Sequence, residues 1–244
     1  MESDNRIKEL FAVGAHFGFV KSRRHPSVKP FIFGKKERVE IFDLEKTAVE
    51  LDKALQFIGE LGKENAVIVF VGGKSEAREA IERSGKELKM PYVASRWIGG
   101  TLTNFPEIKR RLARLEELTT ARERGELAKY TKKERLLIDR EIAKLEAYFG
   151  GIQNLKAMPK ALFVVDPKKE IIAVREAKKM KIPVVALAGS DTNLHDVDYA
   201  IPSNDASRHT ISYILDEVVK SYKSGIENSK LEIKNSVHDH SSTN

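Results

Sequence analysis

The chain has 244 residues and contains no cysteine. This absence excludes disulfides, thiolate zinc sites, iron–sulfur clusters and cysteine nucleophiles, and it fits a reducing compartment. Long apolar runs are also missing, because the longest, at residues 66–71, is far shorter than the ~20 residues of a membrane-spanning helix. The first residues carry no apolar segment typical of a secretory signal. We therefore expect a cytoplasmic protein that makes no contact with a membrane.

Aromatic residues are few, at 7% of the chain with a single Trp, but hydrophobic residues reach 41%. That content supplies a sizeable core and excludes wholesale disorder. Charged residues make up 32%, above the roughly 25% of an average soluble domain. The net charge of +7 favours polyanionic partners only weakly, so the distribution of the charge along the chain matters more than its size.

Hydrophobic patterning predicts an α/β domain. Apolar, β-branched runs at 66–71, 161–165 and 183–188 are typical of strands buried on both faces of a parallel sheet. Shorter strands are expected at 39–42, 91–93 and 199–201. Helical periodicity predicts helices over 1–13, 43–61, 75–88, 167–180 and 204–223. Because strands alternate with helices, we predict a doubly wound, mostly parallel sheet with right-handed crossovers.

The interval 105–150 interrupts this alternation with two helical seams. Pro106 marks the start of the first helix, with Asn104 as its expected cap, and Thr131 with Glu134 forms a capping-box signature for the second. The narrow apolar stripes predict an inserted, antiparallel coiled-coil hairpin. The α/β domain is then discontinuous, over 1–104 and 151–228. Residues 229–244 have little to bury and are expected to form a disordered tail.

The sequence lacks the signatures of several common catalytic sites. The Gly-Lys-Ser of residues 73–75 follows a strand, but a phosphate loop needs Gly at position 68, which is Ile68. The loop 189–198 contains possible metal ligands, Asp191 and His195 among them, but the same residue types are typical of a polar turn. No nucleophile elbow is present. We therefore predict no catalytic residue, no metal and no cofactor; a nucleotide-dependent enzyme stays an alternative that only the fold and residues 72–75 support.

Positive charge is concentrated in residues 19–38, within the segment 14–38, which is expected to be an ordered loop. This stretch has seven Lys or Arg against one acid and so carries nearly the whole net charge. Guanidinium and ammonium groups bind phosphates. The candidate RNA contacts here are Arg23, Arg24, Lys29, Lys35 and Lys36. Phe19, Phe31 and Phe33 alternate with them; these rings either anchor the loop on the sheet, which we favour, or stack on unpaired bases.

A second basic cluster lies at the base of the predicted hairpin. Its candidate RNA contacts are Lys109, Arg110, Arg111 and Arg114, and the alternative is a solvated face paired with neighbouring Glu residues. Just upstream, Arg96 and Trp97 precede a Gly-Gly pair that allows close backbone approach. With Asn104 they are expected to shape the hairpin root and contribute to RNA binding. Alternatively, Trp97 anchors the hydrophobic core. A third, Lys-rich cluster at residues 168–181 is interpreted as a solubilising face.

Several motifs together point to one family. They are GAHFG (14–18), SRRHPSVKPFIFG (22–34), RWIGGTLTN (96–104), PKALFVVD (159–166) and IPSNDASR (201–208). In this order, over roughly residues 5–225, the chain resembles the bacterial small-subunit ribosomal protein S-two family. The resemblance implies a flavodoxin-like domain with an inserted hairpin. It also implies a non-catalytic constituent of the small ribosomal subunit that binds ribosomal RNA and neighbouring ribosomal proteins, with ribosomal protein S-one as a candidate partner. A coiled-coil adaptor is a further alternative.

Overall fold

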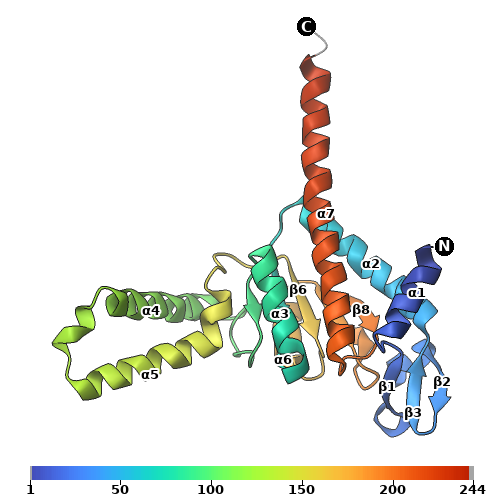
Figure 1. Ribbon diagram of the computed structural model, residues 1–244, viewed down its shortest axis with the longest axis horizontal. Coiled ribbons are helices and arrows are strands. Elements are labelled where there is room, and N and C mark those ends of the chain that lie inside the picture. Colours follow the sequence, from blue (N-terminus) through green and yellow to red (C-terminus); the bar gives the residue numbers. More distant parts are fainter. Residues whose placement is uncertain (1, 242–244) are drawn as a thin grey trace.

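The computed structural model describes residues 2–241 and is built around a parallel sheet of five strands (Figure 1). The strands are β4 (Ile68–Val71), β5 (Tyr92–Val93), β6 (Ala161–Val165), β7 (Val184–Ala188) and β8 (Tyr199–Pro202). Their order across the sheet is β5-β4-β6-β7-β8, and every neighbouring pair is parallel. The strand β4 therefore lies between β5 and β6, and the order of the strands reverses direction at this point. A parallel sheet with this reversal confirms the predicted α/β class.

Helices cover both faces of this sheet. They are α1 (Glu2–Ala12), α2 (Leu44–Lys63), α3 (Ser75–Leu88), α6 (Ile171–Lys179) and α7 (Arg208–Ser241). Successive residues of β4 point to opposite sides: Ile68 and Phe70 join the core under α2, α3 and α7, whereas Val69 and Val71 join the core under α6 and the hairpin root. The continuous apolar runs of the strands follow from this burial on both faces.

A second sheet, which the sequence analysis missed, has three antiparallel strands. Its strands, β1 (Phe17–Val20), β2 (Ile32–Lys36) and β3 (Val39–Phe42), lie in the order β1-β3-β2. Short 3-10 helices at Lys21–Arg23 and Pro26–Phe31 connect β1 to β2. The prediction of a loop over 14–38 is therefore wrong for the two strands, and β3 pairs here rather than in the parallel sheet. Register shifts in both strand pairs break the alternation of exposed and buried residues that predicts a strand.

The inserted hairpin consists of α4 (Phe105–Glu123) and α5 (Lys132–Phe149), joined by a short 3-10 helix at Glu126–Lys129. It projects away from the sheets, at the left of Figure 1. Thr131 and Glu134 form the predicted capping box at the start of α5. The expected cap of α4 is wrong in part: Asn104 stands at the capping position, but its side chain makes no capping hydrogen bond. Its backbone oxygen instead accepts from the amide of Glu107.

The C-terminal helix differs most from the prediction. α7 continues to Ser241 instead of ending near residue 223, so residues 229–241 are helical rather than a disordered tail; residues 242–244 lie outside the described residues. No proline follows residue 208 to stop the helix. Gly225, the last glycine, fits against α2, where a Cβ would meet the backbone of Gly59 and Lys63. No helix within residues 2–241 is long and apolar enough to cross a membrane.

Candidate nucleic-acid interface

The three-stranded sheet and its 3-10 helices present a group of exposed cations, which we name the basic surface. Its members are Lys21, Lys29, Lys35, Lys36 and Arg38. Within the part of the chain that the structure describes, none of the five forms an ion pair with an acidic side chain. The turn between β2 and β3 holds the last three together, with Glu37 in the left-handed conformation at a φ of 55°. Lys21 and Arg38 were counted in the basic stretch but not singled out from sequence.

Arg23 and Arg24, both predicted RNA contacts, are instead held by carboxylates. Arg24 donates to the buried Glu40 at 2.8 Å, and only 20% of its side chain is exposed. Because a buried carboxylate needs a partner, Arg24 stabilises the fold here. Arg23 contacts Asp191 at 2.9 Å, yet 54% of its side chain stays exposed. Arg23 therefore still has donors that face solvent, whereas Arg24 has few.

The aromatic residues of this region divide into anchors and exposed rings. Phe31 packs beside the buried Phe42 and Val28, as the anchoring prediction requires. Phe33, in contrast, is 81% exposed, so that prediction is wrong for this ring. The guanidinium of Arg23 lies 4.1 Å above the ring of Phe19, which fixes both side chains in a cation–π contact. An exposed Phe next to unpaired cations is able to stack against a flat ring.

The hairpin root is organised around Glu176, a buried residue of α6 that the sequence analysis did not find. Its carboxylate accepts hydrogen bonds from the amides of Gly100 at 2.6 Å and Leu102 at 2.9 Å, and from Thr103 at 3.2 Å. The indole of Trp97 points to the same carboxylate at 3.4 Å. Gly100 has a φ of +94°, which an L-residue rarely adopts. The close backbone approach predicted for Gly-Gly is therefore an approach to this carboxylate.

Predicted site residues at the root differ in exposure. Trp97 is only 3% exposed, so the structure agrees with the core-anchor alternative and leaves no ring face for a base. Arg96 and Asn104 are exposed, and Arg96 has no ion pair among the described residues. At the hairpin base, Lys109 lies over the Phe105 ring at 4.9 Å and is likewise unpaired.

The three Arg residues of the hairpin base are partly neutralised. Arg110 and Arg111 share Glu107, at 3.5 and 3.2 Å. Arg114 bridges Glu117 at 3.0 Å and Glu141 of α5 at 3.2 Å, and these hydrogen bonds raise the pKa of Arg114. Such exposed pairs exchange partners at little cost, since each is worth ~0 to 1 kcal/mol.

The crevice beside β4 and β6, where sheets of this type bind ligands, is filled by the protein itself. Lys74 lies there between Asp166 at 2.7 Å and Asp205 at 2.9 Å. Burial lowers the pKa of Lys74, but the two carboxylates outweigh this and raise it, so the ammonium stays charged. A nucleotide phosphate would meet two carboxylates and a Lys already paired with them. The geometry therefore disfavours the nucleotide-dependent enzyme.

The loop 189–198 has a structural role in the same region. Asp191 accepts from Lys168 and Arg23, both at 2.9 Å. Burial raises the pKa of Asp191, but these hydrogen bonds outweigh it and hold the pKa below its usual value. Among residues 2–241, no group of three or more His, Cys, Asp or Glu has the arrangement of a metal site.

These features define an α/β protein with basic surfaces and with its ligand crevice occupied by internal ion pairs. Residues 10–225 match the model of the family described as ribosomal protein S2. The small ribosomal subunit protein uS2 of Thermus thermophilus is 42% identical over 87% of this chain and 83% of its own length. Those of Coprothermobacter proteolyticus and Dehalococcoides mccartyi are 40% and 42% identical, over 91% and 88% of this chain and 82% and 88% of their own lengths.

The chain belongs to the ribosomal protein S2 family. It is therefore a structural protein of the small ribosomal subunit, located on cytoplasmic ribosomes, and not an enzyme.

Proposed function

We propose that the chain binds ribosomal RNA of the small subunit through the basic surface and the hairpin base, and so helps to hold the subunit together. The observation that carries this proposal is the group of five exposed cations on the three-stranded sheet and its 3-10 helices, none of them in an ion pair within the described residues. Lys29, Lys35 and Lys36 are the members predicted from the sequence, and none of the three forms an ion pair with an acid among the described residues. Arg23 and Arg96 add donors, whereas Arg24 and Trp97 act indirectly by holding the fold.

The hairpin base adds a weaker contact. Arg110, Arg111 and Arg114 form exposed pairs with Glu residues, which RNA phosphates are able to displace. Lys109 needs no such exchange. Asn104 stands exposed at the start of α4 and contributes a polar contact. Binding of this kind is driven by counterion release and is therefore strongly salt-dependent.

The direct test is sedimentation of the tagged full chain with ribosomes at physiological salt. We expect the protein in the small-subunit fraction. Its recovery only at the top of the gradient would overturn the proposal.

The surface itself is tested by Lys29→Gln, Lys35→Gln and Lys36→Gln in one protein. With small-subunit rRNA transcribed in vitro, this triple variant should bind about tenfold more weakly, with a salt slope lower by up to about three. The control is Arg175→Gln, Lys179→Gln and Lys181→Gln, which removes equal charge from exposed cations on and after α6. Equal weakening in both variants would show that only net charge acts.

Contact with a neighbouring protein, the second proposed function, is supported by exposed rings beside β1. Phe11 is 62% exposed and stacks on His16, which in turn contacts Phe17, itself 45% exposed. Burial and nearby Lys36 lower the pKa of His16, so this stack is uncharged at neutral pH. An uncharged aromatic face suits a protein rather than RNA, and ribosomal protein S-one is the partner that the family resemblance implies.

This contact is tested with Phe11→Ser and Phe17→Ser together. We expect the double variant to keep its rRNA affinity but to lose retention of purified ribosomal protein S-one. The adaptor alternative predicts that retention depends on the hairpin instead, so a variant that lacks residues 117–140 separates the two.

A further inference from the structure

The distal end of the hairpin carries a further concentration of positive charge. We name residues 122–135 the hairpin tip; they join the end of α4 to the first turn of α5. The tip has six cations and three acids. The cations are Arg122, Arg124, Lys129, Lys132, Lys133 and Arg135. The tip therefore has a local charge of +3 over 14 residues, against +6 over the 20 residues of the basic stretch 19–38.

Most of this charge is not balanced inside the protein. Arg124 approaches Glu126 only at 3.9 Å. The other five cations make no ion pair with the acids that the structure describes. Glu134 is engaged by the capping box, where the amide and hydroxyl of Thr131 donate to it at 2.8 and 2.9 Å. Its carboxylate therefore serves the backbone rather than a neighbouring Lys.

Two of the cations are placed against the preference of their helix. Lys132 and Lys133 occupy the first turn of α5, where the helix dipole favours acidic residues and disfavours cations by ~0.3 to 1 kcal/mol each at an exposed site. Glu134 supplies the favourable negative charge of this turn, but both Lys side chains are exposed and neither forms an ion pair within the described residues. Natural proteins break such local rules mainly at functional or strained sites, which directs attention to this surface.

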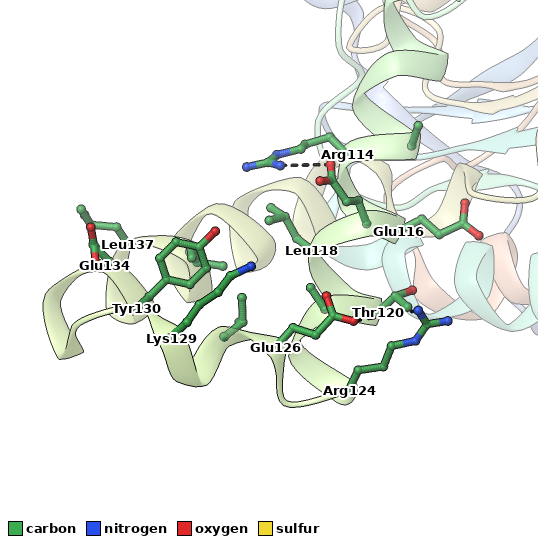
Figure 2. Close-up of a pocket in the computed structure, with 15 residues that line it drawn as sticks. Arg114, Glu116, Leu118, Thr120, Arg124, Glu126, Lys129, Tyr130, Glu134 and Leu137 are labelled. Carbon is green, nitrogen blue, oxygen red and sulfur yellow. Dashed lines mark hydrogen bonds and ion pairs between the residues drawn. The ribbon is translucent and has the colours of Figure 1, made fainter.

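Beside these cations lies a groove of about 690 Å³ between α4 and α5. Figure 2 shows Tyr130 and Lys129 next to each other at its mouth, with Leu137 beyond them. The ammonium of Lys129 lies 5.4 Å from the centre of the Tyr130 ring, and Tyr130 is 38% exposed. An aromatic ring flanked by cations is suited to an unpaired base whose phosphates lie on both sides.

We propose that the hairpin tip is a separate RNA-binding surface. The cations bind phosphates, and Tyr130 stacks on a base or ribose. Charge complementarity selects RNA as the occupant, because the tip has six cations against three acids and five of these cations form no ion pair among the described residues. This inference deepens the proposed function and depends on it. The tip begins beyond the hairpin base, because eight residues of α4, a rise of about 12 Å, separate Arg122 from Arg114.

The first test compares two triple variants of the full chain. The tip variant carries Lys132→Gln, Lys133→Gln and Arg135→Gln, and the control carries the three α6-region changes described above. With small-subunit rRNA transcribed in vitro, the tip variant should bind roughly tenfold more weakly than the control, with a lower salt slope. Its thermal midpoint should stay equal to that of the wild type or rise, because two unfavourable cations leave the helix start. Affinities equal to the control would overturn the proposal.

The second test locates the contact. Because the chain has no cysteine, Ala128→Cys creates a unique attachment point at the tip for an iron chelate that cleaves nearby RNA. We expect discrete cuts in the rRNA, absent when the chelate is attached through Lys179→Cys on α6. Cuts only from the α6 position, or none from the tip in a protein that binds rRNA normally, would overturn the tip surface. If the wild-type chain bound no rRNA at all, the proposed function itself would instead be contradicted.

Discussion

Glu176 shows how a single carboxylate organises a segment. Backbone amides of Gly100, Leu102 and Thr103 surround it, and no cation pairs with it among the described residues. The loop that begins the hairpin is thus fixed to α6 by charge-assisted hydrogen bonds, which are stronger than neutral ones. The direction in which α4 leaves the domain depends on this residue.

Glu176→Gln should lower the free energy of unfolding by about 2 kcal/mol, because an amide nitrogen then faces backbone donors. Hydrogen exchange at Gly100, Leu102 and Thr103 should accelerate. Arg175→Ala, an exposed neighbour on the same helix, should change stability by less than about 0.5 kcal/mol. Unchanged exchange at the three amides would contradict the role of Glu176.

Asp205 gives the protein a defined pH dependence. Burial raises the pKa of Asp205 to about 6, despite the attraction of Lys74. The folded state therefore binds a proton more readily than the unfolded state, so stability is lost as the pH rises from about 4 to 6. Asp205→Asn lacks this titration. Its free energy of unfolding, relative to wild type, should increase by about 3 kcal/mol from pH 4 to pH 7.

Urea unfolding at a series of pH values measures this difference. Asp139→Asn, a change at an exposed carboxylate of α5, is the matched control and should follow the wild type at each pH. Parallel curves for the wild type and Asp205→Asn would contradict the assignment.

At the scale of elements, strands buried on both faces were predictable and half-exposed strands were not. Runs such as residues 161–165 contain only apolar residues, because α6 covers one face and α7 the other. β1 and β2 have four and five residues, each with a glycine and a register shift, so no period of two survives in their sequence. Their pairing with β3 is a tertiary property.

For the candidate site, the positions of the cations were predictable from the sequence, but their ion-pair partners were not. The sequence locates the cations of residues 19–38, yet the partners of Arg23 and Arg24 are Asp191 and Glu40, distant in sequence or hidden in a strand. Burial of Trp97 likewise depends on α6, which follows much later in the chain. The sequence predicts that Phe33 anchors the loop, whereas the register shift in β2 leaves its ring exposed.

The start of α5 provides a test of one element. Thr131→Ala removes the side chain that accepts from the amide of Glu134 and should cost about 1 kcal/mol of local stability. Because the hairpin tip lies far from the main cores, we expect faster hydrogen exchange over residues 132–135 with little change in the global midpoint. Thr120→Ala, within α4, is the control and should leave this exchange unaltered.

At the scale of the whole molecule, the hairpin shares its root with the core of the domain. Phe105, Phe149 and Trp97 belong to the same apolar cluster as Val71 and Val164 of the sheet. Beyond the root only seam residues such as Leu118 and Leu127 stay buried, whereas Leu137 is 53% exposed. The root is therefore part of the domain, while the distal half is an appendage.

Replacing residues 117–140 by a short turn should leave the thermal midpoint within a few degrees of the wild type. Replacing residues 106–148 should lower it far more, because the remaining root rings then lose apolar contacts worth ~1.5 to 3 kcal/mol each. Emission from Trp97, the single Trp, reports the state of the root and should shift to the red only in the longer deletion. Equal midpoints for both deletions would contradict this division.

The inserted hairpin also affects the route by which the sheet assembles. β4 pairs with both β5 and β6, and residues 94–160 separate these two partners in the chain. Because α4 and α5 associate locally, they bring the ends of this long interval together before the strands meet. Only the residues of this interval outside the hairpin then remain as a flexible loop. Closing this shorter loop has an entropic cost that is lower by about 1 kcal/mol. Since local helix pairing is generally faster than distant strand pairing, we expect the projecting hairpin to form early and to speed assembly of the sheet.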